Sequence, residues 1–197
     1  MSPAARPSDG LDLVELSREA TAALDALLAD AVAKVRQRVA AGGKPDARLL
    51  DREQRATHGL AWLATYVEAV RQLAAYTERM TQAGTFGETE DLLVRIALGE
   101  YLAQIVGGIP MSQGELVRPG DLGLSQAQVA ARIKGDVEGL IVSGNTAERR
   151  ARLVELMRAG HQATVGACGL DDTLESIREE MRKFADSEVV AHAQGWH

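Results

Sequence analysis

The stretch from Thr57 to Met80 constrains the fold more than any other part of the chain. Its apolar residues recur at steps of three and four, which is the spacing of one face of an α-helix. A helix that is apolar around most of its circumference cannot lie on a surface, so this stretch predicts a central helix with other helices packed around it. We interpret these positions as core and not as a cofactor pocket. The face comprises Leu60, Leu63, Val67, Val70 and Ala74, of which the first four are expected to be buried, and it is widened by Trp62, Tyr66, Leu73, Tyr76 and Met80.

Helical periodicity extends through most of the remaining chain. Gly42-Gly43 ends a first helix, and Ser125 with Gln128 forms an S-x-x-Q capping box that starts a fourth one. No segment alternates with the two-residue period of a β-strand. The sequence therefore predicts an all-α fold, a bundle of five to six helices. The expected helices start near residues 11, 46, 88, 125, 146 and 171.

Two segments depart from the helical pattern. Residues 1–10 contain two prolines and small residues, which predicts a disordered tail. Residues 107–124 contain five glycines and two prolines, which rule out a continuous helix. Loops of this length in compact domains are either functional or disordered. Because its apolar residues include Ile109 and Leu122, we expect a long ordered loop that lies over the bundle.

Composition and charge narrow the class of protein. Apolar residues make up 46% of the chain, which is enough for a core. The net charge of −6 argues against nucleic acid and anionic membranes as partners, since both need clustered positive charge. No apolar run approaches the roughly 18 residues of a membrane span, and the N-terminus lacks a signal-peptide core. With a single cysteine, Cys168, a disulfide framework is excluded, and we expect a cytoplasmic protein.

The residue types that carry catalytic or metal chemistry form no recognisable site. No glutamate is followed three residues later by histidine, as a di-iron site in a helical bundle would need. We interpret Glu188 and His192 as a surface pair and His58 as a capping or packing residue. Cys168 lies near His161 but outside any nucleophile motif, and nucleotide-binding glycine motifs are absent. We therefore assign no catalytic, cofactor-binding or metal-binding residue to this chain.

The segment around Arg118 is the best local candidate for binding, as a possible anion-binding loop. Its glycines expose backbone N–H groups, and the guanidinium can meet a carboxylate or a phosphate. The alternative is that Arg118 pairs with Glu115 or Asp121 and that the segment is a structural cover. The sequence leaves both interpretations open.

Two parts of the chain resemble the acyl-CoA dehydrogenase family. The segment 170–197 is similar to the opening helix of the catalytic core in that family, although Ala191 stands where proline is common. The preceding residues resemble the helical N-terminal extension of methylsuccinyl-CoA dehydrogenase-like members, through THGLAWLATYVEAVRQL and IPMSQGELVRPGDLGL. The positions that carry the first likeness are Arg178, Arg182, Phe184, Ala185, Val189 or Val190, and Ala193.

The resemblance implies a division of the chain and a place for the chemistry. Residues 11–169 would form the helical extension, and residues 170–197 the truncated first helix of a catalytic domain. In this family FAD lies between a β domain and a C-terminal helical bundle, and a glutamate in the C-terminal portion abstracts the substrate α-proton. FAD is thus implied for the full-length protein, whereas its catalytic and flavin-binding residues would lie beyond His197.

These observations lead to two main hypotheses of function. The first is the N-terminal helical region of a flavoenzyme that dehydrogenates an acyl-CoA at the α,β position, without the active site. Its partners would be the catalytic domain of the same polypeptide or a neighbouring subunit, and we expect a homo-oligomer. The alternative is a free-standing helical protein–protein interaction module. A third and weaker hypothesis is a small-molecule-binding bundle that uses Arg118.

Overall fold

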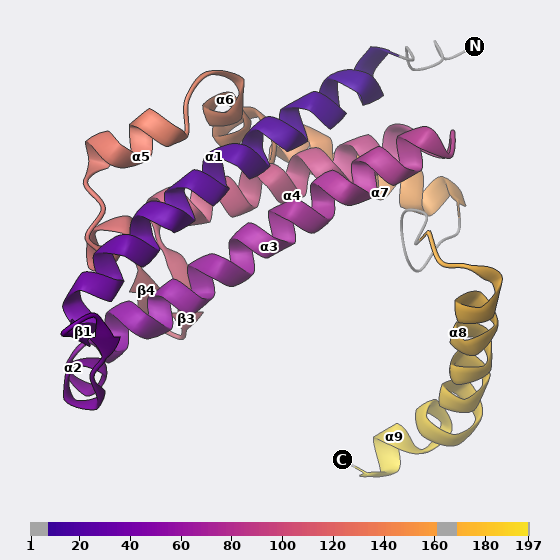
Figure 1. The fold of residues 1–197 in the computed structure, drawn as a ribbon. Coiled ribbons are helices and arrows are strands. Elements are labelled where there is room, and N and C mark those ends of the chain that lie inside the picture. The colour runs from indigo at the N-terminus through magenta and orange to yellow at the C-terminus, as the bar shows by residue number, and fades with distance from the viewer. Residues whose placement is uncertain (1–7, 161–168, 197) are drawn as a thin grey trace. The chain divides into compact units, whose positions relative to one another are not determined.

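The structure is a computed structural model that describes residues 8–160 and 169–196 of the chain. It divides into two units, residues 1–166 and residues 167–197, each of which is described by itself. The first unit carries helices α1 to α7 and two short hairpins, and the second carries α8 and α9 (Figure 1). The predicted all-α helical fold is confirmed, because helices dominate both units.

Two long helices, α1 (Ser8–Val39) and α3 (Gln54–Gln82), pack along each other in the first unit (Figure 1). Val67 and Val70 of α3 are fully buried and Leu63 is nearly so, as predicted, whereas Leu60 is only partly buried. The buried face runs through Gly59 instead, because Val117 packs against that glycine. On α1 the buried stripe comprises Leu13, Ala20, Leu24, Leu27, Ala31, Val35 and Val39.

The helix predicted as central is enclosed on one side only. α3 contacts α1 and α4 (Glu88–Gly107), but Trp62 and Tyr66 are only partly buried and Glu68 is exposed. The stretch therefore shares the core with its neighbours, and the prediction that other helices surround it is wrong. Its aromatic residues occupy the margin of the core, where a ring can bury its apolar face and leave its polar atom in contact with water.

Helix α4 crosses α6 (Gly135–Ser143) at two glycines. A Cβ on Gly99 would lie 2.8 Å from the Cα of Gly144, and one on Gly144 would lie 2.5 Å from the carbonyl oxygen of Arg95. The two backbones therefore approach as closely as they do because neither residue has a side chain. Helix α7 (Ala147–Gly160) is tied to α4 by the ion pair between Arg152 and Glu88.

The sequence predicted no β-strand, and this is wrong at two places in the described residues. β1 (Ala40–Ala41) pairs with β2 (Lys44–Pro45), and β3 (Ile109–Ser112) pairs with β4 (Glu115–Val117), both antiparallel. Strands of two to four residues are too short for an alternating pattern to show in the sequence. The sequence signal for these hairpins lies in their turn glycines, because Gly42, Gly43 and Gly114 all have the positive φ that tight turns need.

The segment expected to be an irregular loop thus contains a hairpin followed by the 3₁₀-helix η1 (Pro119–Leu122). Ile109 and Val117 are opposite each other in the hairpin register, and both are almost fully buried. Leu122 and Leu124 join them in the core cluster. The segment therefore contributes side chains to the core of the first unit.

Two of the predicted helices are interrupted. The second is divided at Glu53 into α2 (Ala47–Arg52) and α3, and the fourth is divided into α5 (Gln126–Arg132) and α6. The break lies at Ile133 and Lys134, and Gly135, the first residue of α6, has a φ of 60° in the left-handed region that glycine favours. The capping box predicted at Ser125 is confirmed, with the Gln128 N–H donating to the Ser125 Oγ at 3.2 Å.

The second unit is a continuous helical segment. α8 (Asp172–Phe184) passes through the π-helical turn η2 (Ala185–Val190) into α9 (Ala191–Trp196). Asp171 caps α8 by accepting the N–H of Leu174 at 2.8 Å, and the helix begins close to the predicted residue 171. Across the residues that the structure describes, no helix combines the length and apolarity needed to span a membrane.

Candidate ligand pocket and its arginine

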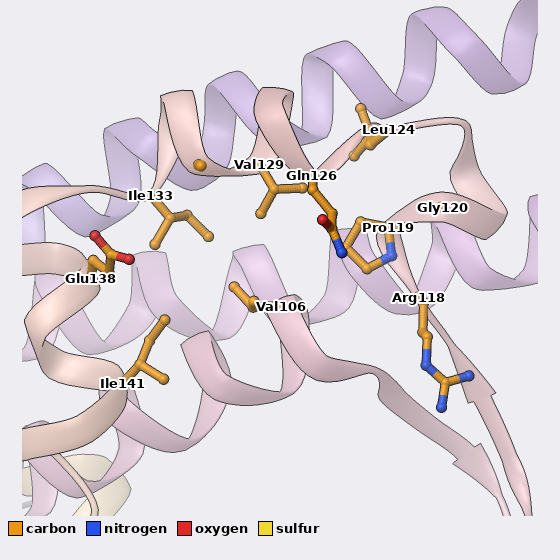
Figure 2. A pocket seen from close by; sticks show the side chains of 11 residues that line it. Val106, Arg118, Pro119, Gly120, Leu124, Gln126, Val129, Ile133, Glu138 and Ile141 are labelled. Carbon is orange, nitrogen blue, oxygen red and sulfur yellow. The ribbon is translucent and has the colours of Figure 1, made fainter.

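An apolar pocket of about 480 Å³ opens between α4, η1, α5 and α6 of the first unit. Its volume falls within the roughly 300–1,000 Å³ range typical of small-molecule sites. Figure 2 shows Arg118 at one end, Glu138 at the other and apolar side chains between them. The lining comprises Val106, Arg118, Pro119, Gly120, Leu124, Gln126, Val129, Ala130, Ile133, Glu138 and Ile141.

The pocket depends on the break between α5 and α6. Val129 and Ile133 line it from α5 and its C-cap, and Ile141 lines it from α6. A continuous helix would have carried these residues along one axis, whereas Gly135 redirects the chain so that they line the same pocket. The sequence placed Val129 and Ile133 on an inner face and contained Gly135 as a turn signal, but it did not indicate a hollow.

Arg118 is exposed and stands just before η1, with its guanidinium extending from the pocket toward the strands (Figure 2). The sequence left open whether it pairs with Glu115 or Asp121. In the part of the chain that the structure describes, both acids pair with Arg55 instead. The Arg55 guanidinium lies 3.6 Å from the Glu115 Oε1 and 3.5 Å from the Asp121 Oδ2, and it donates to the carbonyl of Leu116 at 2.6 Å.

Arg118 takes part in the turn through its backbone. Its N–H donates to the Asp121 Oδ2 at 2.8 Å. This hydrogen bond makes the largest contribution to the lowered pKa of Asp121. The nearby guanidinium of Arg55 lowers that pKa further, and the charge of Arg118 acts in the same direction. Arg118 therefore feels Asp121 electrostatically without forming a contact ion pair with it among the described residues.

A second arginine holds the same turn from α1. The Arg38 Nη1 donates to the carbonyl of Asp121 at 2.7 Å. Gly123 follows with a φ of 82°, and a Cβ there would lie 2.6 Å from the Arg38 Nη2. Arg38 and Arg55 thus fasten this segment to α1 and α3, and Arg118 lies at the end of the pocket without a contact ion pair among the described residues.

The other residues singled out from the sequence are dispersed. His58 is exposed and accepts the Trp62 Nε1–H at 2.9 Å, so it makes the packing contact predicted for it. Glu188 and His192 are both exposed, and the ring of His192 lies against Trp196. His161 and Cys168 lie outside the described residues, as does His197. Within the described ranges, no group of three or more metal-ligating side chains occurs.

A polar chain across α3, α4 and the start of α7 was not anticipated from the sequence. Tyr66 donates to Gln104, Gln104 donates to Glu100, and the Asn145 Nδ2 donates to the other oxygen of Glu100 at 2.6 Å. Burial raises the pKa of Tyr66, and its neighbours Tyr101 and Glu100 raise it further. Glu100 and Gln104 are one turn apart on α4, but Tyr66 comes from α3 and Asn145 from the connection before α7, so the sequence does not show that they meet.

The apolar stripe of α8 is exposed. Leu174 is 48% exposed, Ile177 55%, Met181 60% and Phe184 55%, although they recur at helical spacing. Val190 and Trp196 continue the exposure beyond α8, at 65% and 68%. A single helix has no second layer on which to bury such a stripe, so nothing within its own unit covers this face.

The first unit is an all-α bundle with an apolar pocket that has one cationic residue, Arg118, in its lining. Folds of this class serve many functions, so the fold alone does not identify this one. No protein-family model matches the chain. Over 187 residues, however, the chain is 48% identical to the (2S)-methylsuccinyl-CoA dehydrogenase of Cereibacter sphaeroides. The match covers 94% of this chain and 33% of that protein, so the chain spans about a third of the length of this curated relative. The resemblance predicted from the sequence, to methylsuccinyl-CoA dehydrogenase-like proteins of the acyl-CoA dehydrogenase family, is confirmed.

Proposed function

We propose that the chain is the N-terminal helical region of an acyl-CoA dehydrogenase-like flavoenzyme, and that it acts as a packing and oligomerisation module. The observation that carries this proposal is the 48% identity to a methylsuccinyl-CoA dehydrogenase over nearly the whole chain. Identity at that level over 187 residues supports a common fold and a common place in a larger protein. The full-length protein would dehydrogenate an acyl-CoA at the α,β position.

FAD would bind to residues outside this chain. In doubly wound folds a dinucleotide is held by backbone N–H groups of a glycine-rich turn at a helix N-terminus, which bind its pyrophosphate. The pocket described above has an apolar lining with one cation, Arg118, and this does not fit a pyrophosphate. In this proposal, the groups that react with the substrate all lie outside this chain.

The exposed stripe of α8 supports a packing role. In the proposal, Leu174, Ile177, Met181 and Phe184 bury themselves against the catalytic portion of the same polypeptide or of a neighbouring subunit. Fully burying an apolar side chain contributes roughly 1.5–3 kcal/mol. Because these four side chains are already about half buried, each would add about half of that on docking.

The first test uses the chain with FAD and an acyl-CoA. We expect no bleaching of the flavin absorbance, since the proton-abstracting and flavin-binding groups are assigned elsewhere. Turnover by the chain alone would contradict the proposal.

The second test is reconstitution with the relative. The C. sphaeroides enzyme, lacking the third that matches this chain, would be mixed with the chain and analysed by size-exclusion chromatography with light scattering. Co-elution is expected for the native chain and not for the double variant Ile177→Asp/Phe184→Asp. The control is Glu179→Ala, on the polar side of α8, which should co-elute normally. Co-elution of the double variant would contradict docking through this face.

A second candidate function is a free-standing interaction module. It is favoured by the core cluster of the first unit, which is built wholly from residues of that unit. A monodisperse chain that does not co-elute with the truncated relative would support this candidate over the first.

A further inference from the structure

We infer that the pocket between α4, η1, α5 and α6 binds an amphiphile with a single anionic head group and an apolar tail. Its apolar wall is continuous from Leu124 through Val129 to Ile133, and all three residues are more than 90% buried. The opposite wall is Val106 of α4, which is 39% exposed. An unfilled apolar hollow lacks contacts on one side of every lining atom, so an apolar tail placed there restores them.

The position of Arg118 indicates which end of the ligand carries the anionic group. Arg118 lies at one end of the pocket, and the two acids of its own segment, Glu115 and Asp121, are engaged by Arg55 at 3.6 Å and 3.5 Å. Its guanidinium is thus free of contact ion pairs within the part of the chain that the structure describes, and guanidinium groups bind carboxylate and phosphate oxygens. The head group would lie at this mouth, in contact with solvent.

The far end of the pocket restricts the ligand further. Glu138 lines that end, so a second anionic group on the tail would be repelled there. A ligand with one charged end and one neutral end therefore fits better than a diacid. The pocket lies wholly within residues 106–141, so the inference does not depend on the proposed role in a flavoenzyme.

The test is isothermal titration calorimetry of the 197-residue chain with four ten-carbon probes, each below its micelle concentration. Decanoate and decyl phosphate carry the anionic head, decanol is neutral, and decyltrimethylammonium is cationic. We expect both anions to bind, decanol to bind about fivefold more weakly, as an exposed ion pair allows, and the cation to bind weakest. The ratio of decanoate to decyl phosphate distinguishes a carboxylate from a phosphate as the preferred head.

Two variants separate the head-group contact from the tail contact. Arg118→Ala should weaken decanoate about fivefold and leave decanol unchanged, while Arg118→Lys should retain most of the affinity. Val106→Trp, at an exposed position, should fill the hollow and remove binding of decanoate and decanol alike. The control is Arg158→Ala in α7, an exposed arginine that is not part of the lining.

Circular dichroism before each titration confirms that the variants are folded. The inference is overturned if neither anion binds, or if decanol binds as tightly as decanoate. It is also overturned if a folded Val106→Trp variant binds decanoate with unchanged affinity. Preference for the cationic probe would assign the head group to Glu138 and equally overturn it.

Discussion

Helices α1 and α8 carry the same kind of apolar pattern and have opposite surroundings. In α1 the residues Leu24, Leu27 and Ala31 recur at steps of three and four and are completely buried. In α8, Leu174, Ile177 and Met181 recur at the same steps and are about half exposed. The difference is that α1 has α3 along its length, whereas α8 has no second layer within its own unit. Periodicity thus predicts that a helix has an apolar face, and only the rest of the structure determines what covers it.

The largest expected effect tests this contrast directly. Leu24→Ala in α1 removes a fully buried side chain and should reduce the free energy of unfolding by about 2–5 kcal/mol. Ile177→Ala in α8 removes a side chain that is 55% exposed and should change it by less than about 0.5 kcal/mol. Urea-induced unfolding followed by circular dichroism measures both. Equal losses would mean that α8 is covered in the isolated chain.

A smaller effect distinguishes two glycines of the first unit. A Cβ on Gly99 would lie 2.8 Å from the backbone of Asn145, Gly144 and Leu140, so Gly99→Ala should force α4 and α6 apart and cost about 1–3 kcal/mol. Gly139, in α6 itself, has open space where its Cβ would be. Gly139→Ala should therefore stabilise the protein by up to about 1 kcal/mol, through helix propensity.

Both glycine variants can be compared by urea unfolding at the same protein concentration. If Gly99→Ala is as stable as the native chain, then the close approach of α4 and α6 is not a requirement of the packing. If Gly139→Ala is destabilising, the prediction that an added Cβ meets no neighbouring atom at this position is wrong.

The helices could be predicted from the sequence wherever an apolar stripe is long. The stripes of α1 and α4 and the capping box at Ser125 all carry local signals, and each of them appears in the structure. The shift of the buried face of α3 from Leu60 to Gly59 could not be predicted. It depends on Val117, which lies more than fifty residues away in the sequence.

The candidate site was predictable only in part. Arg118 was singled out because of its neighbouring glycines, and it does line a pocket. The partner of Glu115 and Asp121 was not predictable, since Arg55 reaches them from another helix. The hollow itself arises where Gly135 turns the chain between two helices, and a turn signal does not show how much space the turn leaves.

The next effect compares these two arginines. Arg55→Ala removes the 2.6 Å hydrogen bond to the Leu116 carbonyl together with both ion pairs, and should cost about 0.5–1.5 kcal/mol. Arg118→Ala removes no contact ion pair within the described residues and should stay within about 0.5 kcal/mol of the native chain. Thermal unfolding of the two variants side by side provides the measurement. A larger loss from Arg118→Ala would favour the alternative that Arg118 is a structural residue.

The smallest effect concerns the pH dependence of Asp121. The Arg118 N–H and the Arg55 guanidinium lower the pKa of Asp121 in the folded state below its ordinary value of 3.8. Because the folded pKa is the lower one, the carboxylate stabilises the protein fully well above pH 3.8, and this contribution is lost as the pH falls through the folded pKa.

Asp121→Asn removes the titration and can still accept the Arg118 N–H. The difference in urea midpoint between the native chain and Asp121→Asn should therefore be constant from pH 7 to about 5 and should narrow below pH 3.8. A difference that persists undiminished in acid would mean that Arg55 fastens the turn through the Leu116 carbonyl and not through the charge of Asp121.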